Sequence, residues 1–483
     1  MSQVNAFRDW DEEKLRSYYR GSEDIKFSTG SFGAAGESLT LVYCEGLGDI
    51  KQLFETVIPT LEQSFPEGEP PAEAWSSLQA RLDLTELQTD HDLSLRLFSG
   101  ALLLFHHRSR RVFAHAMGNI PKRDPSESTT EISLKGPRDG FTEELTMNVA
   151  LIRKRLRTPE LHNEKFTLGK QSQTEVSLMY ISGVVQPALL KEARARIQSF
   201  EADSLLSSSQ LEEALGDNVY SLFPLIDYIG RPDFVAQALV RGRLAVLVNG
   251  SPMALVLPSN LMEQIKSPED LHLPYYFVAF ERTLRISGLI IAIFLPGFWV
   301  ALCAFNSEQL PFHLLATVAN SRVGLPLSVA LEAILMLGMF ELFREAGSRL
   351  PKAVGQTVAV VGGLIVGDAA IRAGLTSPTT LVVSAVTAVS TYTLVNLSLS
   401  GTVSIMRLFV LICSAVLGMF GFFISMFSIV AYMSGLTSLG IGYLEPMSPV
   451  SFKDLLKTIL DVPKRWKDVR PAMLKQPNLK DKE

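Results

Sequence analysis

The sequence predicts an α/β soluble N-terminal region of two modules, followed by an all-α polytopic membrane domain and a short basic tail. Residues 1–280 carry 38 acidic and 28 basic side chains, whereas residues 281–483 carry 12 acidic and 17 basic ones. The longest charge-free stretches occur after residue 285, and strand and helix patterns alternate before it. The basic excess lies beside these apolar stretches and in the tail, so it gives no support to nucleic-acid binding.

The second half contains segments long enough to cross a bilayer. Residues 286–307 carry no charge, and about 20 apolar residues span the roughly 30 Å of hydrocarbon. Residues 354–370 and 379–397 provide two more candidates, and the run 408–433 within the charge-free residues 408–444 is the most apolar. Arg282 and Arg285 directly precede the first segment, which places that end in the cytoplasm.

Topology follows from the two ends of the chain. The N-terminus has no apolar signal-peptide core, and the C-terminal tail is basic, so both are predicted to lie in the cytoplasm. The number of crossings must then be even, although five segments are apolar enough to cross. Segment 325–343 contains Glu332 and Glu341, and we predict that it is interfacial, re-entrant or lining a cavity, which leaves four crossings. The predicted domains are a first cytoplasmic α/β module (1–130), a second one (131–275), a helical transmembrane domain (276–440) and a basic cytoplasmic tail (441–483).

The soluble half divides into two α/β modules at a polar linker, residues 120–140. In the first, a strand pattern at 39–46 precedes a helix pattern at 49–65, and further strands are predicted at 101–107 and 110–117. The second opens with a helix at 141–157, capped by Thr142 or Asp139. It continues with a strand at 175–183, helices at 188–200 and 233–242, and a hairpin of two strands around Asn249-Gly250.

The cysteines of the chain, and the glycines and histidines of its soluble half, have simpler interpretations than a chemical role. Cys44, Cys303 and Cys413 are isolated, which indicates single buried thiols. The glycines of GSFGAAG, residues 30–36, lack phosphate-loop spacing and predict a flexible loop. Three strand histidines, His106, His107 and His115, have no carboxylate or cysteine at ligand spacing. We therefore predict no catalytic, cofactor or metal site, and no enzymatic activity.

Polar residues in the membrane domain are more informative. Glu332 lies in an apolar segment, where an ionisable group usually faces a bundle interior, water or a partner, and its own helix offers no base within two turns. A stripe of hydroxyls recurs at helical spacing: Thr380, Ser384, Thr387 and Thr391. Such a stripe serves helix–helix contact or, in an oligomer, faces an aqueous pore. We predict that Glu332 and the stripe line a pore, and that Gly363 and Gly367 form a G-x-x-x-G packing face.

Four motifs in order resemble the GerA-type spore germination protein family, which comprises germinant-receptor A subunits and their close paralogues. They are GPRDGFTEELTMNVALIRKRLRTPEL (136–161), RPDFVAQALVRGRLAVLVNGSPMALVLP (231–258), LFREAGSRLPKAVGQTVAVVGGLIVGDAAIRAGLTSP (342–378) and GIGYLEPMSPVSFKDLLK (440–457). The resemblance runs from about residue 39 to about residue 463.

The resemblance implies a role in germination at the spore inner membrane. It implies a homo-oligomer, with a pentamer suspected, that conducts ions beside a permease-like B subunit and a lipoprotein C subunit, or beside a small membrane partner in a paralogous branch. A single copy with so few spans makes a poor transporter, whereas a ring of copies turns one Glu332 into several convergent sites. The alternatives are a non-conducting receptor or scaffold subunit and, in another class, a membrane-anchored enzyme.

Overall fold

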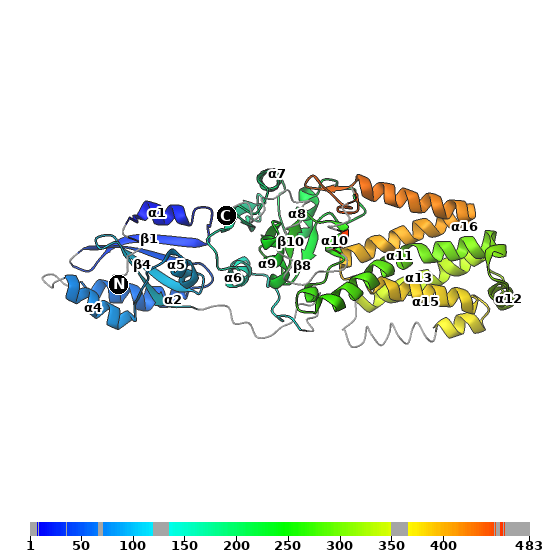
Figure 1. Ribbon diagram of the computed structural model, residues 1–483, viewed down its shortest axis with the longest axis horizontal. Coiled ribbons are helices and arrows are strands. Elements are labelled where there is room, and N and C mark those ends of the chain that lie inside the picture. The colour runs from blue at the N-terminus through cyan, green and yellow to red at the C-terminus, as the bar shows by residue number, and fades with distance from the viewer. Residues whose placement is uncertain are drawn as a thin grey trace. The chain divides into compact units, whose positions relative to one another are not determined.

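The computed structural model describes residues 7, 9–34, 36–65, 71–118, 135–348, 366–448, 450, 455–456 and 458. The chain forms two compact units (Figure 1). Unit 1 comprises residues 1–219, 226–258 and 467–483, and unit 2 comprises residues 220–225 and 259–466. The α/β region and the helical region predicted from the sequence are both confirmed. The domain boundaries at 130, 275 and 440 remain predictions.

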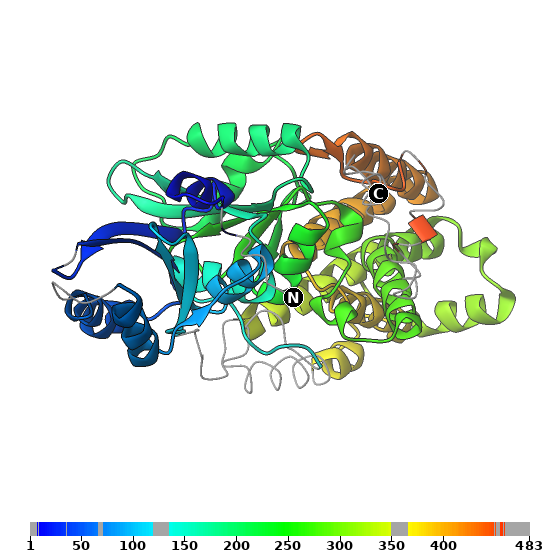
Figure 2. The same cartoon turned by 60° about the vertical axis from the view of Figure 1, so that its left-hand side comes forward.

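The first module of unit 1 is an antiparallel five-stranded sheet of order β1-β2-β4-β5-β3 with helices on both faces. Its long β1–β2 hairpin is drawn in blue in Figure 2. The elements are α1 (Glu12–Tyr18), β1 (Ile25–Phe32), β2 (Glu37–Cys44), α2 (Ile50–Gln52), the π-helix η1 (Leu53–Val57), α3 (Ile58–Gln63), α4 (Pro71–Leu82), β3 (Thr85–Glu86), α5 (Asp90–Leu97), β4 (Ala101–His106) and β5 (Arg111–Ala116).

The second module repeats this plan with the order β6-β7-β9-β10-β8, again antiparallel throughout. The hairpin predicted around Asn249-Gly250 is confirmed as the β9–β10 pair. The elements are α6 (Leu145–Arg155), β6 (Leu161–Leu168), β7 (Thr174–Ile181), α7 (Pro187–Gln198), α8 (Ser208–Leu215), β8 (Asp227–Ile229), α9 (Pro232–Val240), β9 (Leu244–Val248) and β10 (Ala254–Leu257).

Two local predictions in unit 1 differ from the structure. The N-cap of α6 is Glu144, not Thr142 or Asp139. The backbone N–H and the hydroxyl of Thr142 donate to the side-chain oxygen of Asn148, and Asp139 pairs with Arg155 at 2.5 Å. The loop predicted at GSFGAAG is shorter than predicted, because residues 30–32 belong to β1 and pair with residues 37–39 of β2.

Unit 2 is helical. Short elements precede its long helix α11, and a hairpin of two two-residue strands follows its last long helix. The elements are α10 (Leu261–Gln264), the 3-10 helix η2 (Pro268–Leu271), α11 (Tyr275–Phe305), η3 (Ser307–Gln309), α12 (Phe312–Ser321), α13 (Val329–Ser348), α15 (Pro378–Thr391), α16 (Leu397–Gly435), β11 (Thr437–Ser438) and β12 (Ile441–Gly442). Residues 366–372 are also helical, and α13 and α15 pack against α11.

The span predicted at 408–433 is not one straight helix. Gly418 interrupts α16 with φ 62° and ψ −141°, a conformation that is essentially restricted to glycine. Both ends of α16 reach Leu222, whose amide donates to the Tyr432 hydroxyl at 3.1 Å and whose carbonyl accepts from the Thr402 hydroxyl at 2.5 Å. A straight helix would separate these two partners by about 45 Å. The element is therefore a helical hairpin with legs 397–417 and 419–435 that meet at Gly418.

Two described helices are long and apolar enough to cross a membrane by length and composition, α11 and residues 398–435. α15 is a shorter apolar helix. Most of the predicted segment 354–370 lies outside the described residues, as does Gly363. Gly367 is described, and a Cβ there would lie 3.3 Å from the Leu381 side chain of α15, so this glycine allows close helix contact.

Candidate functional site: a buried polar seam

Buried polar side chains form a seam through the apolar helices of unit 2. The seam comprises Glu332 and Glu341 of α13, Ser377 at the N-cap of α15, the four hydroxyls of α15 and Arg407 of α16. All of them are buried except Glu341, which is half-buried. The four hydroxyl residues are Thr380, Ser384, Thr387 and Thr391, the stripe that the sequence predicts.

Glu332 lies at one end of the seam and is fully buried. Its Oε2 accepts hydrogen bonds from the Ser377 backbone N–H and from the Ser377 hydroxyl, both at 3.0 Å. Its Oε1 lies 3.4 Å from the Arg322 guanidinium, which comes from the end of α12. The absence of a base nearby along its own helix therefore does not leave Glu332 unpaired. Arg322 and the N-terminus of α15 compensate its charge.

Arg407 lies at the other end, and sequence reasoning missed it. Its guanidinium forms a very short contact with Glu341 and donates to the Thr391 hydroxyl at 3.1 Å and to Ser404 at 3.2 Å. Glu341 is shared, because Arg344 also pairs with it at 2.6 Å. A small pocket lies between these groups, lined by Leu337, Phe340, Ala388 and Tyr392 beside them. The sequence does single out Arg407, because it is the one charged residue between the charge-free stretches 373–406 and 408–444.

The stripe lies inside the bundle of a single chain. A hydroxyl at its middle, Thr387, donates to the Val383 carbonyl of its own helix at 2.7 Å. The lumen of a ring of copies would be lined by side chains that are exposed on the single chain. The stripe and Glu332 are instead buried inside the single chain, as expected for side chains that mediate contact between its helices. Their role as pore-lining residues remains a prediction.

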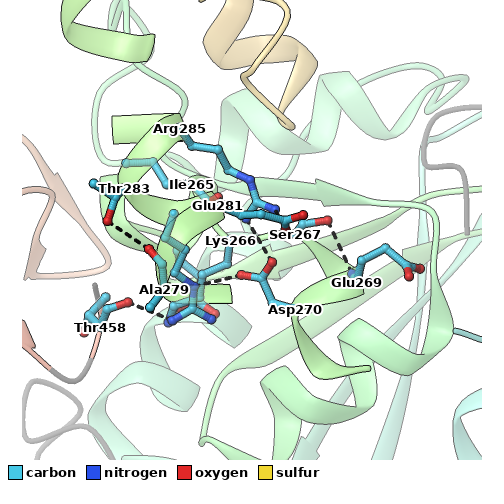
Figure 3. Close-up of polar contacts among 12 residues, drawn as sticks. Ile265, Lys266, Ser267, Glu269, Asp270, Ala279, Glu281, Thr283, Arg285 and Thr458 are labelled. Carbon is cyan, nitrogen blue, oxygen red and sulfur yellow. Dashed lines mark hydrogen bonds and ion pairs between the residues drawn. The ribbon is translucent and has the colours of Figure 1, made fainter. Parts of the chain in front are cut away.

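A second charged cluster surrounds the start of α11 (Figure 3). Asp270 of η2 accepts from Arg282 at 2.8 Å and from Arg285 at 2.9 Å, one guanidinium on each carboxylate oxygen. Arg285 also pairs with Glu281 at 2.9 Å, and Arg282 donates to the Thr458 carbonyl at 2.8 Å. Arg282 is thus buried and Arg285 partly buried, and both are neutralised within unit 2; that they mark the cytoplasmic end of a span remains a prediction.

Comparison with known proteins decides the family. Residues 13–473 match the family described as Bacillus/Clostridium GerA spore germination protein. The chain belongs to this family. The match extends further at both ends than the sequence resemblance predicts, and it includes both polar clusters.

Relatives of this GerA-family chain cover nearly its whole length. It is 38% identical to "Spore germination protein XA" of Bacillus anthracis over 96% of this chain and 95% of the relative. It is 32% identical to "Spore germination protein B1" of Bacillus subtilis (strain 168) over 95% of each. A crystal structure of the N-terminal domain of the A subunit of the Bacillus megaterium spore germinant receptor GerK3 aligns with TM-score 0.41 and 27% identity, covering 53% of this chain and 97% of that one.

Unit 1 has a buried ion pair of its own, between Asp24 of the first module and Arg153 of the second. The guanidinium donates to the two carboxylate oxygens at 2.7 and 2.8 Å. Burial by itself raises the pKa of Asp24, but the charge of Arg153 outweighs it, so the pKa of Asp24 lies below its ordinary value. Burial raises the pKa of the neighbouring Cys44 thiol. This pair joins the two modules.

The remaining residues singled out from the sequence have structural partners. His106 contacts Glu37 at 3.0 Å and Ser109 at 2.6 Å, and His115 contacts the Leu82 carbonyl at 2.5 Å. Within the described part of the chain, no group of three or more His, Cys, Asp or Glu side chains is placed to hold a metal. Cys44, Cys303 and Cys413 are free thiols.

Proposed function

We propose that this GerA-family chain is a subunit of an oligomeric membrane assembly, suspected to be a pentamer, that releases monovalent cations during spore germination. It crosses the spore inner membrane several times, with its N-terminal unit in the cytoplasm and with no catalytic role. Its partners are other germination membrane subunits: a permease-like B subunit and a lipoprotein C subunit, or a small membrane partner. The names of the relatives support germination, and the apolar helices α11 and α16 support membrane insertion.

The observation that carries the conduction proposal is the polar seam. Ionisable and hydroxyl side chains inside a membrane bundle are costly, and they commonly mark ion paths. Here two carboxylates lie near the two ends of α15, and four buried hydroxyls share the helix face between them. We propose that the conducting state opens this seam between α13 and α15, so that the hydroxyls replace part of the water around a passing cation.

Potassium release from vesicles tests the proposal. The purified chain alone is expected to release K⁺ faster than empty vesicles do. Thr387→Val removes a buried hydroxyl whose donated bond stays within its own helix, and we expect it to slow release about two- to tenfold, the value of one hydrogen bond. Val386→Thr, which adds a hydroxyl on the exposed face of α15, is the matched control and should conduct as wild type does.

A second function follows from the closed state of the seam. Glu332 is compensated by Arg322 and Ser377, and Arg407 by Glu341, so the seam holds no unneutralised charge for a cation to replace. This favours a non-conducting receptor or scaffold subunit that relays nutrient binding to a separate channel. A folded and assembled chain that passes no K⁺ by itself would refute conduction and leave this second function standing.

A further inference from the structure

The first three turns of α11 have an inverted amphipathic arrangement. Five large apolar side chains point outward, and their exposed fractions are 48% for Tyr275, 66% for Tyr276, 44% for Phe277, 60% for Phe280 and 49% for Leu284. The charged side chains of the same turns are Glu281, Arg282 and Arg285, and their guanidinium and carboxylate groups pair within unit 2 (Figure 3). A helix in water exposes its charges and buries its aromatic rings, which is the reverse of this pattern.

The outward face continues without a break into the predicted span. Ile290 and Phe298, further along α11, are also exposed. Thr283 is exposed on the first turns, and its hydroxyl donates to the Ala279 carbonyl of its own helix at 2.8 Å (Figure 3). The hydroxyl of Thr283 therefore needs no partner outside the protein. Ser287, one turn further on, is exposed as well. The outward face therefore presents aromatic rings, aliphatic side chains and two small hydroxyl residues, with no charged side chain among them.

The length of α11 leaves room for a different membrane boundary. Its 31 residues measure about 46 Å, about 16 Å more than the hydrocarbon core. If the charge-free stretch alone lay in hydrocarbon, from residue 286, Tyr276 would lie about 15 Å outside its edge. That distance exceeds the roughly 5–7 Å of one headgroup layer, so exposed aromatic rings would stand in water.

We propose that the cytoplasmic membrane boundary lies at Tyr276–Phe280, and that the outward faces of these residues contact the headgroup and acyl-chain interface of the lipid. Tyrosine and phenylalanine suit this position, because Tyr rings are amphipathic and interfacial aromatic rings anchor spans. A stretch of about 20 residues, the length that crosses the hydrocarbon, runs from Phe280 to residue 299 and stays within α11. This inference rests on the membrane insertion of α11 proposed above, and not on conduction.

The boundary gives a physical reason for the Asp270 cluster. It places Arg282 and Arg285 at the edge of the hydrocarbon, where water is scarce and an unpaired guanidinium is expensive. Each guanidinium is held by Asp270, and both side chains are largely buried inside unit 2. At a surface in contact with water, ion pairs contribute little to stability, and charged side chains usually remain exposed. A water-facing helix would therefore gain little from holding these two arginines inward.

Photo-crosslinking in vesicles of phosphatidylethanolamine and phosphatidylglycerol tests the boundary. Benzoylphenylalanine replaces Tyr276 or Phe280 in the full chain, which keeps an aromatic ring at each position. We expect lipid adducts by mass spectrometry, with a yield within about threefold of that at Ile290, an exposed position deep in the span. Leu206, which is 79% exposed in unit 1, is the control and should give no lipid adduct.

The other outcomes each refute a defined statement. Adducts at Ile290 with none at Tyr276 and Phe280 would overturn the boundary and leave membrane insertion intact. No lipid adduct at any position, Ile290 included, would overturn both. A covalent dimer on a denaturing gel from Tyr276 or Phe280, in place of lipid adducts, would assign this face to a second copy of the chain and overturn the lipid contact.

Discussion

Breaking the Asp24–Arg153 pair should destabilise unit 1 strongly. Both side chains are almost fully buried, and two hydrogen bonds join them at 2.7 and 2.8 Å. Arg153→Met keeps an unbranched side chain beside Phe98, whose ring centroid lies 4.8 Å from the guanidinium carbon. It leaves the Asp24 carboxylate buried without its partner. Removing one member of a buried pair costs about 3–5 kcal/mol, and we expect that loss in the free energy of unfolding.

The assay is urea unfolding of the full chain in detergent, followed by the fluorescence of Trp10 and Trp75 of unit 1 in a background with Trp299→Phe and Trp466→Phe. Lys51→Met is the matched control, because Lys51 pairs with Glu55 at 3.9 Å on the exposed surface and should change stability by no more than about 0.5 kcal/mol. The double variant Asp24→Leu with Arg153→Met should recover most of the loss. If Arg153→Met costs no more than the control, the ion pair does not hold the two modules together.

Three further predictions concern other parts of the chain. Gly421→Ala should destabilise unit 2 by at least about 1 kcal/mol in thermal melts in detergent, because the added Cβ would lie 2.1 Å from the Cys413 carbonyl oxygen. Gly401→Ala is its control: the added Cβ would meet nothing within 4 Å, so this variant should be neutral or stabilising. Burial, Glu213 and Asp227 raise the pKa of Glu212 to about 7. Glu212→Gln should therefore stabilise unit 1 above pH 7 by roughly 1 kcal/mol, allowing for solvent screening. It should have almost no effect near pH ~3, where the carboxyl is protonated in both the folded and the unfolded state. Arg407→Met should lower the free energy of unfolding by about 1–3 kcal/mol in the same melts. This loss is smaller than the one expected for Arg153→Met, because Glu341 keeps Arg344 as a partner. A loss equal to or larger than that of Arg153→Met would contradict this explanation.

The sequence predicts the central strands of both sheets and misses every edge strand. The predicted strands are β2, β4, β5, β7, β9 and β10, which have neighbours on both sides. The missed ones, β1, β3, β6 and β8, are the four sheet edges. Central strands read as apolar runs because both of their faces are covered. β1 (IKFSTGSF) and β6 (LHNEKFTL) expose part of their length, so their sequences carry more polar residues and no apolar run.

The seam could be predicted only in part, for a different reason. The stripe is visible because its residues lie on one helix and repeat at helical spacing. The partners of its charged ends come from other helices. Arg322 reaches Glu332 because the chain reverses between α12 and α13, and Arg407 reaches Glu341 across 66 positions of sequence. Distance along one helix could not identify either pair, so sequence reasoning left Glu332 without a base.

The hairpin at Gly418 bears on the prediction that the segment of α13 does not cross the membrane. That prediction followed from the number of crossings, which must be even if both ends of the chain lie in the cytoplasm, whereas five apolar segments were counted. The structure divides the most apolar segment into two antiparallel legs of 21 and 17 residues, about 31 and 25 Å long, and each is close to the 30 Å of a hydrocarbon core. Six predicted segments, one of them 354–370, most of which lies outside the described residues, would give the even number of crossings that the predicted location of both ends requires. α13, at 20 residues, is itself about 30 Å long, and both of its carboxylates are paired within the bundle, which is the condition under which a helix can carry charge across a membrane.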